Sequence, residues 1–115
     1  INTWSYRPEA FHADDILSYA RAFQHGPAFK CAMAYYRGLR KDLKFLGPNL
    51  LKGARWRGES AVIWGQHDPI FPPIVGQALA REIGANLVTV GDAGHFPQTE
   101  NPEPVNEAIR SLLCG

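Results

Sequence analysis

The stretch Ser60-Ala-Val-Ile-Trp-Gly-Gln-His-Asp-Pro-Ile-Phe-Pro-Pro73 decides how this chain folds. Its first apolar run is too short for a helix and is bounded by turn-forming residues, so it predicts a buried strand over Ser60–Trp64. The strand is expected to stop at Gly65, and a tight loop then carries Asp68. An acidic side chain is therefore expected just past the carboxyl end of a strand.

A second unit of the same kind follows. The run Asn86–Val90 predicts another strand, and the loop after it carries His95. Helical spacing of apolar residues predicts one helix over Pro72–Ile83, between the two strands, and a last helix that opens at Pro102–Pro104. The order strand, helix, strand, helix predicts an α/β fold with two parallel strands and a right-handed crossover. Both loops then lie at the same edge of the sheet.

The amino-terminal part of the chain is predicted to be helical. One helix begins near His12 and the next spans about Pro27–Phe45, each with apolar residues at intervals of three and four. Ile1–Phe11 shows little periodicity and predicts an irregular, packed lead-in. We therefore expect two parts, a helical segment over residues 1–52 and an α/β part over residues 53–115.

Composition excludes several classes of partner. The 115 residues are 45% hydrophobic and 20% charged, with a formal charge of +1, as in an ordinary globular protein. No apolar run approaches the roughly 18 residues of a membrane span, and the basic run from Arg37 to Arg57 lacks a nucleic-acid recognition motif. Neither a membrane nor a nucleic acid is expected as a partner, and no cofactor or metal is implied.

Cys31 and Cys114 match no metal-ligand spacing. We interpret both as free thiols in a reducing compartment, which indicates a cytoplasmic protein, with a disulfide as the alternative. The first residue is Ile rather than Met. The chain is therefore expected to be a processed product, a trimmed chain or a piece of a longer protein.

Asp68 and His95 are the candidate catalytic residues. A histidine that acts as a general base needs a partner that fixes its tautomer. Asp68 can accept a hydrogen bond from Nδ1–H of His95, which leaves Nε2 free to take a proton, as in a nucleophile–base–acid triad. The sequence contains neither a Gly-x-Ser-x-Gly nor a Gly-x-Asp-x-Gly motif that would supply the nucleophile. The alternative interpretation is that Asp68 caps the helix that Pro72 begins and that His95 is only a loop residue.

Two motifs resemble a known family. Trp64-Gly-Gln-His-Asp-Pro-Ile-Phe-Pro-Pro73 resembles the acid loop of the α/β-hydrolase fold. Gly91-Asp-Ala-Gly-His-Phe-Pro-Gln-Thr-Glu-Asn-Pro-Glu-Pro-Val-Asn106 resembles its histidine loop and final helix. The resemblance implies a partial α/β-hydrolase fold, in which the end of a helical cap, or lid, precedes the last two strands and helices of the core.

A third motif lies in the expected cap. Ala34-Tyr35-Tyr36-Arg37 resembles the tyrosine–arginine helix of epoxide hydrolases and fluoroacetate-type dehalogenases. In those families a cap tyrosine donates a hydrogen bond to the epoxide oxygen or to the leaving halide. The resemblance makes Tyr36 the first candidate for substrate binding and Tyr35 the second. The alternative is that this aromatic stripe packs in the core.

Two functions of different classes remain open at this point. The resemblance implies the carboxyl-terminal part of an epoxide hydrolase or dehalogenase that acts on a small-molecule substrate, with an esterase as the next choice. Without the nucleophile, the chain alone is expected to be inactive. The alternative is a non-catalytic oligomerisation or interaction module. Because the strand ending at Trp64 would lack one neighbour, we expect a homodimer or pairing with the missing amino-terminal part.

Overall fold

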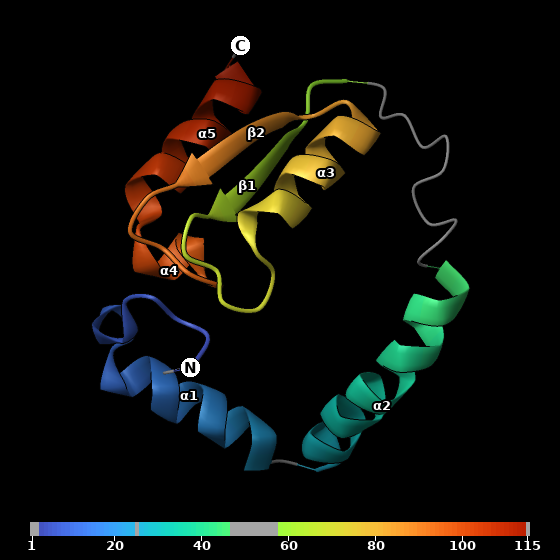
Figure 1. Ribbon diagram of the computed structural model, residues 1–115. Coiled ribbons are helices and arrows are strands. Elements are labelled where there is room, and N and C mark those ends of the chain that lie inside the picture. Colours follow the sequence, from blue (N-terminus) through green and yellow to red (C-terminus); the bar gives the residue numbers. More distant parts are fainter. Residues whose placement is uncertain (1–2, 25, 47–57, 115) are drawn as a thin grey trace. The chain divides into compact units, whose positions relative to one another are not determined.

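The computed structural model describes residues 3–24, 26–46 and 58–114 (Figure 1). The chain divides into two compact units, of which one joins Ile1–Ala10 with Gly53–Gly115 and the other is Phe11–Lys52. The predicted boundary between the parts falls mostly outside the described residues. Residues 3–10 lie with the α/β unit, whereas the sequence predicts a helical segment over residues 1–52.

The α/β unit is built on two parallel strands, β1 (Ala61–Gly65) and β2 (Asn86–Val90), which pair along all five residues. Helix α3 (Pro73–Ile83) connects them. It begins with a proline, which suits the first turn of a helix, and it ends at Gly84, whose φ of 72° is left-handed and costs a glycine little. The predicted strand–helix–strand order is confirmed, with β1 shifted by one residue.

Different helices cover the two faces of this sheet. Ile63 packs against a buried cluster that includes Val105 of helix α5 (Pro102–Cys114). Trp64, the next residue of β1, lies against Gly76 of α3, where an added Cβ would come within 2.6 Å of the indole ring. Since successive side chains of a strand point to opposite faces, α5 and α3 lie on opposite sides of the sheet (Figure 1).

The second unit contains helices α1 (Ala13–Gln24) and α2 (Ala28–Leu46). Asp14 and Asp15 lie in the first turn of α1, where the helix dipole favours negative charge. Both helices begin and end close to where their apolar spacing predicts. Several large apolar side chains of these helices are exposed: Ile16, Leu17, Tyr19, Phe23 and Phe29.

Two short elements were not predicted from the sequence. They are the 3-10 helix η1 (Pro8–Ala10) and the single-turn helix α4 (Pro97–Glu100). An element of three or four residues is too short to show a periodic apolar stripe. Both lie in the α/β unit, and they contact each other.

Two features of the structure concern the cysteines and the hydropathy of the helices. Cys31 and Cys114 are free and exposed. In the part of the chain that the structure describes, none of the helices combines the length and hydropathy needed to cross a bilayer.

Candidate active site

The acid loop (Gln66–Pro72), which follows β1, holds Asp68 through its own backbone. Oδ1 of Asp68 accepts hydrogen bonds from the N–H groups of Ile70, at 2.8 Å, and Phe71, at 3.0 Å. Among the residues that the structure describes, no side chain caps the amino end of α3. The alternative in which Asp68 caps that helix is therefore wrong, because its carboxylate accepts hydrogen bonds from N–H groups of the loop that precedes the helix.

The environment of Asp68 favours its charged form. The side chain is only 6% exposed, and this burial opposes ionisation. The hydrogen bonds from Phe71, His95 and Ile70 outweigh the burial and hold the pKa of Asp68 below its ordinary value. The carboxylate is therefore an acceptor near neutral pH.

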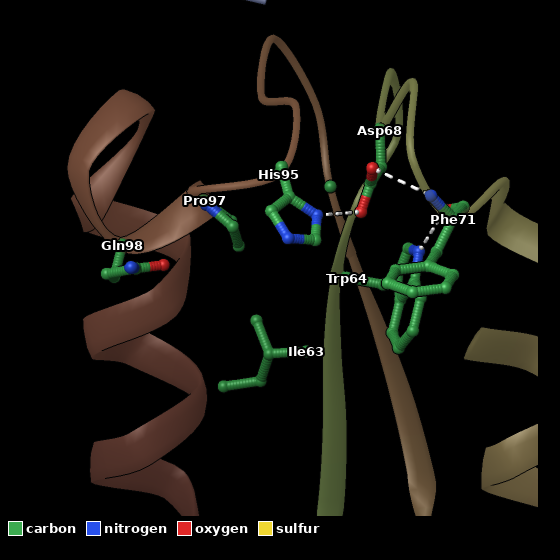
Figure 2. Close-up of a pocket in the computed structure, with 8 residues that line it drawn as sticks. Ile63, Trp64, Asp68, Phe71, His95, Pro97 and Gln98 are labelled. Carbon is green, nitrogen blue, oxygen red and sulfur yellow. Dashed lines mark hydrogen bonds and ion pairs between the residues drawn. The ribbon is translucent and has the colours of Figure 1, made fainter. Parts of the chain in front are cut away.

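The predicted juxtaposition of Asp68 and His95 is present in the structure. Oδ2 of Asp68 lies 2.9 Å from Nδ1 of His95 (Figure 2). Because the ionised carboxylate only accepts hydrogen bonds, we assign the proton to Nδ1, which makes Nε2 the free nitrogen of the ring. Figure 2 shows the ring turned so that its second nitrogen points away from Asp68, on the side of Ile63.

The two loops meet closely because Gly65 has no side chain. A Cβ at this position would overlap the carbonyl oxygen of Gly94 in the histidine loop (Gly91–Phe96). The N–H of His67 donates to the carbonyl of Ala93 at 2.9 Å, so hydrogen bonding continues beyond the ends of the strands. This close approach brings the acid and the histidine within reach of each other.

The pair opens onto a small hollow of about 230 Å³. Its lining consists of Ile63, Trp64, Gly65, Asp68, Phe71, His95, Pro97 and Gln98. This hollow is smaller than a typical ligand pocket of about 300–1,000 Å³. Within the described residues, no group of three or more His, Cys, Asp or Glu side chains is arranged to hold a metal ion.

Aromatic rings surround His95 on several sides. Phe71 and Phe96 lie with ring centroids 5.8 Å and 5.2 Å from the imidazole. Trp4 approaches it edge-on at 5.5 Å, and its carbonyl accepts the N–H of His95 at 3.0 Å. Trp4 lies in residues 3–10, the part of the predicted lead-in that belongs to the α/β unit and that is called the lead-in from here on. The sequence does not predict the place of Trp4 in the site, because nothing in the sequence links it to His95.

The two candidate substrate-binding tyrosines lie on α2, in the helical unit. Tyr35 is 65% exposed and Tyr36 is 51% exposed, and the two rings meet edge-on at 5.6 Å. Neither ring is buried in a core, which was the alternative interpretation. Their role in substrate binding stays a prediction.

Comparison with known proteins identifies the family. The sequence profile described as "Alpha/beta hydrolase family" matches residues 2–108. The chain therefore belongs to the α/β hydrolase family, and its fold is a partial α/β-hydrolase fold, as predicted.

Individual proteins also resemble the chain. It is 30% identical over 99 residues to the uncharacterized hydrolase YugF of Bacillus subtilis (strain 168), a match that covers 85% of this chain and 34% of YugF. The chain thus spans about a third of the length of this curated relative. A solved structure of a thermophilic esterase from Thermogutta terrifontis is 44% identical, covers 49% of this chain and 21% of that chain, and gives a TM-score of 0.46.

Proposed function

We propose that this chain supplies the acid, Asp68, and the general base, His95, of a hydrolase whose nucleophile lies outside these 115 residues. The hydrogen bond of 2.9 Å between Nδ1 of His95 and Oδ2 of Asp68 carries the proposal. In the reaction, Nε2 takes the proton of the attacking group, and the carboxylate stabilises the imidazolium that forms. The proton later passes from Nε2 to the leaving group or back to water.

For the substrate we propose an epoxide or a halogenated acid, with an ester as the second choice. The support is the Tyr35-Tyr36 pair and its resemblance to the tyrosine–arginine helix of those hydrolases. A phenol can donate a hydrogen bond to the oxygen anion or halide that develops during the reaction. Both rings are exposed on α2 and so are available to a ligand.

A complete reading frame that contains this chain provides the direct test. We expect its product to hydrolyse at least one member of a panel of epoxides, haloacids and esters. His95→Ala should lower kcat by about 10⁶-fold, as loss of a triad base does elsewhere. His67→Ala is the matched control, since His67 lies in the acid loop but stacks on Tyr6, and it should leave kcat within about twofold.

The 115-residue chain alone should hydrolyse none of these substrates, because it contains no Gly-x-Ser-x-Gly or Gly-x-Asp-x-Gly motif to supply the nucleophile. Turnover by the isolated chain that His95→Ala abolishes would contradict this expectation. If the product of the complete frame is also inactive on the whole panel, the second candidate function, a non-catalytic interaction module, is favoured. The exposed apolar side chains of α1, such as Leu17 and Phe23, are the observation that supports that candidate.

We propose that two copies of the chain pair through the free edge of β1. In the described residues the sheet has only two strands, so one edge of β1 has no strand beside it. Its sequence, Ala-Val-Ile-Trp-Gly, contains no proline or lysine to discourage pairing. We expect the isolated chain to dimerise through this edge. Sedimentation equilibrium that gives a monomer mass at micromolar concentrations would exclude a dimer, and a dimer that survives Val62→Pro would exclude pairing through this edge.

A further inference from the structure

Glu100 is a buried carboxylate beside the histidine loop. Its exposed fraction is 2%, and its carboxylate accepts hydrogen bonds from four backbone N–H groups. Oε2 accepts from Tyr6 at 2.7 Å, Arg7 at 2.8 Å and Gly94 at 3.0 Å. Oε1 accepts from Phe96 at 3.0 Å. These four donors match the roughly four acceptor sites of a carboxylate.

The charge on Glu100 is stabilised by these donors. Burial opposes the charged form, but the backbone N–H groups of Arg7, Gly94 and Phe96 outweigh it and hold the pKa of Glu100 below its ordinary value. Near neutral pH the group is therefore a carboxylate that only accepts hydrogen bonds. It has no proton to exchange with His95.

The four donors come from two segments that both touch His95. Gly94 and Phe96 are the residues on either side of the histidine, and both donate to Glu100. Tyr6 and Arg7 follow Trp4, whose carbonyl accepts the N–H of His95 itself. The backbone of the histidine and of both its neighbours is thus fixed, either by Glu100 or by the segment that Glu100 holds.

We propose that Glu100 is a positioning residue for His95. Its carboxylate fixes the backbone before and after the histidine and holds the lead-in against the imidazole, so that Nδ1 stays within hydrogen-bond distance of Asp68. Glu100 acts through the backbone and not on the substrate. The positioning of His95 by Glu100 is inferred from these contacts alone, whereas the effect of that positioning on catalysis rests on the proposed function.

Glu100→Gln tests the proposal because the amide keeps the size of the side chain but only one acceptor oxygen. If that oxygen takes the place of Oε2, the amide N–H₂ faces the N–H of Phe96, and two donors oppose each other. Glu103→Gln is the matched control, since it makes the same change at an exposed position of α5.

Nitrogen-15 spectra of the imidazole provide a readout that a merely structural role would not change. In the wild type and in Glu103→Gln, we expect a downfield proton resonance from the Nδ1–H group of His95, which is hydrogen-bonded to Asp68. In folded Glu100→Gln this proton signal should be lost, or the proton should exchange with water at least about tenfold faster. The reason is that each hydrogen bond lost from Glu100 leaves the backbone beside His95 less firmly held. An unchanged His95 signal in folded Glu100→Gln would overturn the proposal.

Kinetics on the product of the complete reading frame add the catalytic consequence. A misplacement of about 1 Å costs about 10²-fold, so kcat of Glu100→Gln should fall by about that factor with KM little changed, while Glu103→Gln stays like the wild type. If the wild type hydrolyses nothing, the proposed function fails, but the imidazole spectra still decide the role of Glu100. If the wild type is active and Glu100→Gln keeps both its kcat and its His95 signal, the positioning role fails alone.

A second variant covers the case in which Glu100→Gln does not fold. Glu100→Asp keeps the charge and both oxygens but is one methylene shorter, so it cannot reach donors on both sides of His95 at once. We expect a folded protein with an intermediate Nδ1–H exchange rate. A wild-type imidazole signal in Glu100→Asp would overturn the proposal.

Discussion

The acid loop and the histidine loop hold their candidate catalytic side chains in different ways. Asp68 is fixed by N–H groups two and three residues further along its own loop, those of Ile70 and Phe71. His95 is fixed from outside its loop, by the carbonyl of Trp4 and by the contacts of Glu100 with the residues on either side of it. Asp68 therefore depends on its own loop, whereas His95 also depends on the lead-in from the other end of the chain, which Glu100 holds.

The largest expected loss of stability comes from breaking the contact between the loops. Gly65→Val places a branched side chain where even a Cβ would overlap the Gly94 carbonyl. The backbone of both loops must then shift, and we expect a loss of about 4 kcal/mol in the free energy of unfolding. Urea unfolding measures this loss. Gly91→Val is the comparison, because the nearest atom to a Cβ there is 3.6 Å away, in the side chain of Gln66.

The second effect separates the two modes of support. Glu100→Gln leaves buried N–H groups without an acceptor and should cost about 3 kcal/mol of unfolding free energy. Asp68→Asn should cost only about 1 kcal/mol, because the amide oxygen can still accept from Ile70 and Phe71 while His95 changes tautomer to accept from the amide N–H₂. Equal losses in urea unfolding would contradict the contrast between local and remote support.

The two variants should rank in the opposite order when kcat is measured instead of stability. In the product of the complete reading frame, Asp68→Asn should lower kcat by about 10⁴-fold, because the imidazole is then held in the wrong tautomer. Glu100→Gln should lower it by only about 10²-fold. If the less stable variant also has the lower kcat, both carboxylates serve the fold alone.

The sequence predicts the local half of this arrangement better than the remote half. The strands and α3 follow from apolar runs and turn residues. Parallel topology brings the loops of Asp68 and His95 to one edge of the sheet, and the family resemblance indicates that the two residues pair. The hydrogen bonds of Glu100 to Tyr6 and Arg7 span 94 and 93 residues, and no pattern in the chain signals such a contact. The sequence predicts that the strand stops before Gly65, but Gly65 pairs with Val90, and the absence of a Cβ lets the loops converge there.

The family resemblance predicts the fold family and the acid–histidine pair, which apolar periodicity alone does not, but it does not identify the reaction. The acid and histidine motifs are matched by the profile of the α/β hydrolase family over residues 2–108. The nucleophile and the substrate are set by residues that the motifs do not contain. The α2 tyrosines show why, since their exposure on a helix fits a ligand contact and yet specifies no leaving group.

The third effect concerns acid pH. The pKa values of Glu100 and Asp68 are both lowered in the folded protein. Each carboxylate therefore contributes stability that is present above its unfolded pKa, about 4.3 for Glu and 3.9 for Asp, and that is lost as the pH falls through the lowered folded value. The free energy of unfolding should decline below about pH 4. Glu100→Gln should flatten this decline, and Glu103→Gln should leave it unchanged.

The smallest expected effect distinguishes the backbone of the lead-in from its side chains. Tyr6 is 50% exposed, and its ring stacks on His67 at 4.1 Å, while its backbone N–H donates to Glu100. Tyr6→Ala removes the ring and keeps the N–H, so it should cost about 0.5–1.5 kcal/mol in urea unfolding. The Nδ1–H signal of His95 should stay as in the wild type, because Glu100 still holds the same backbone. If Tyr6→Ala disturbs that signal as much as Glu100→Gln does, the lead-in is held by its aromatic packing, and the remote support of His95 does not depend on the carboxylate.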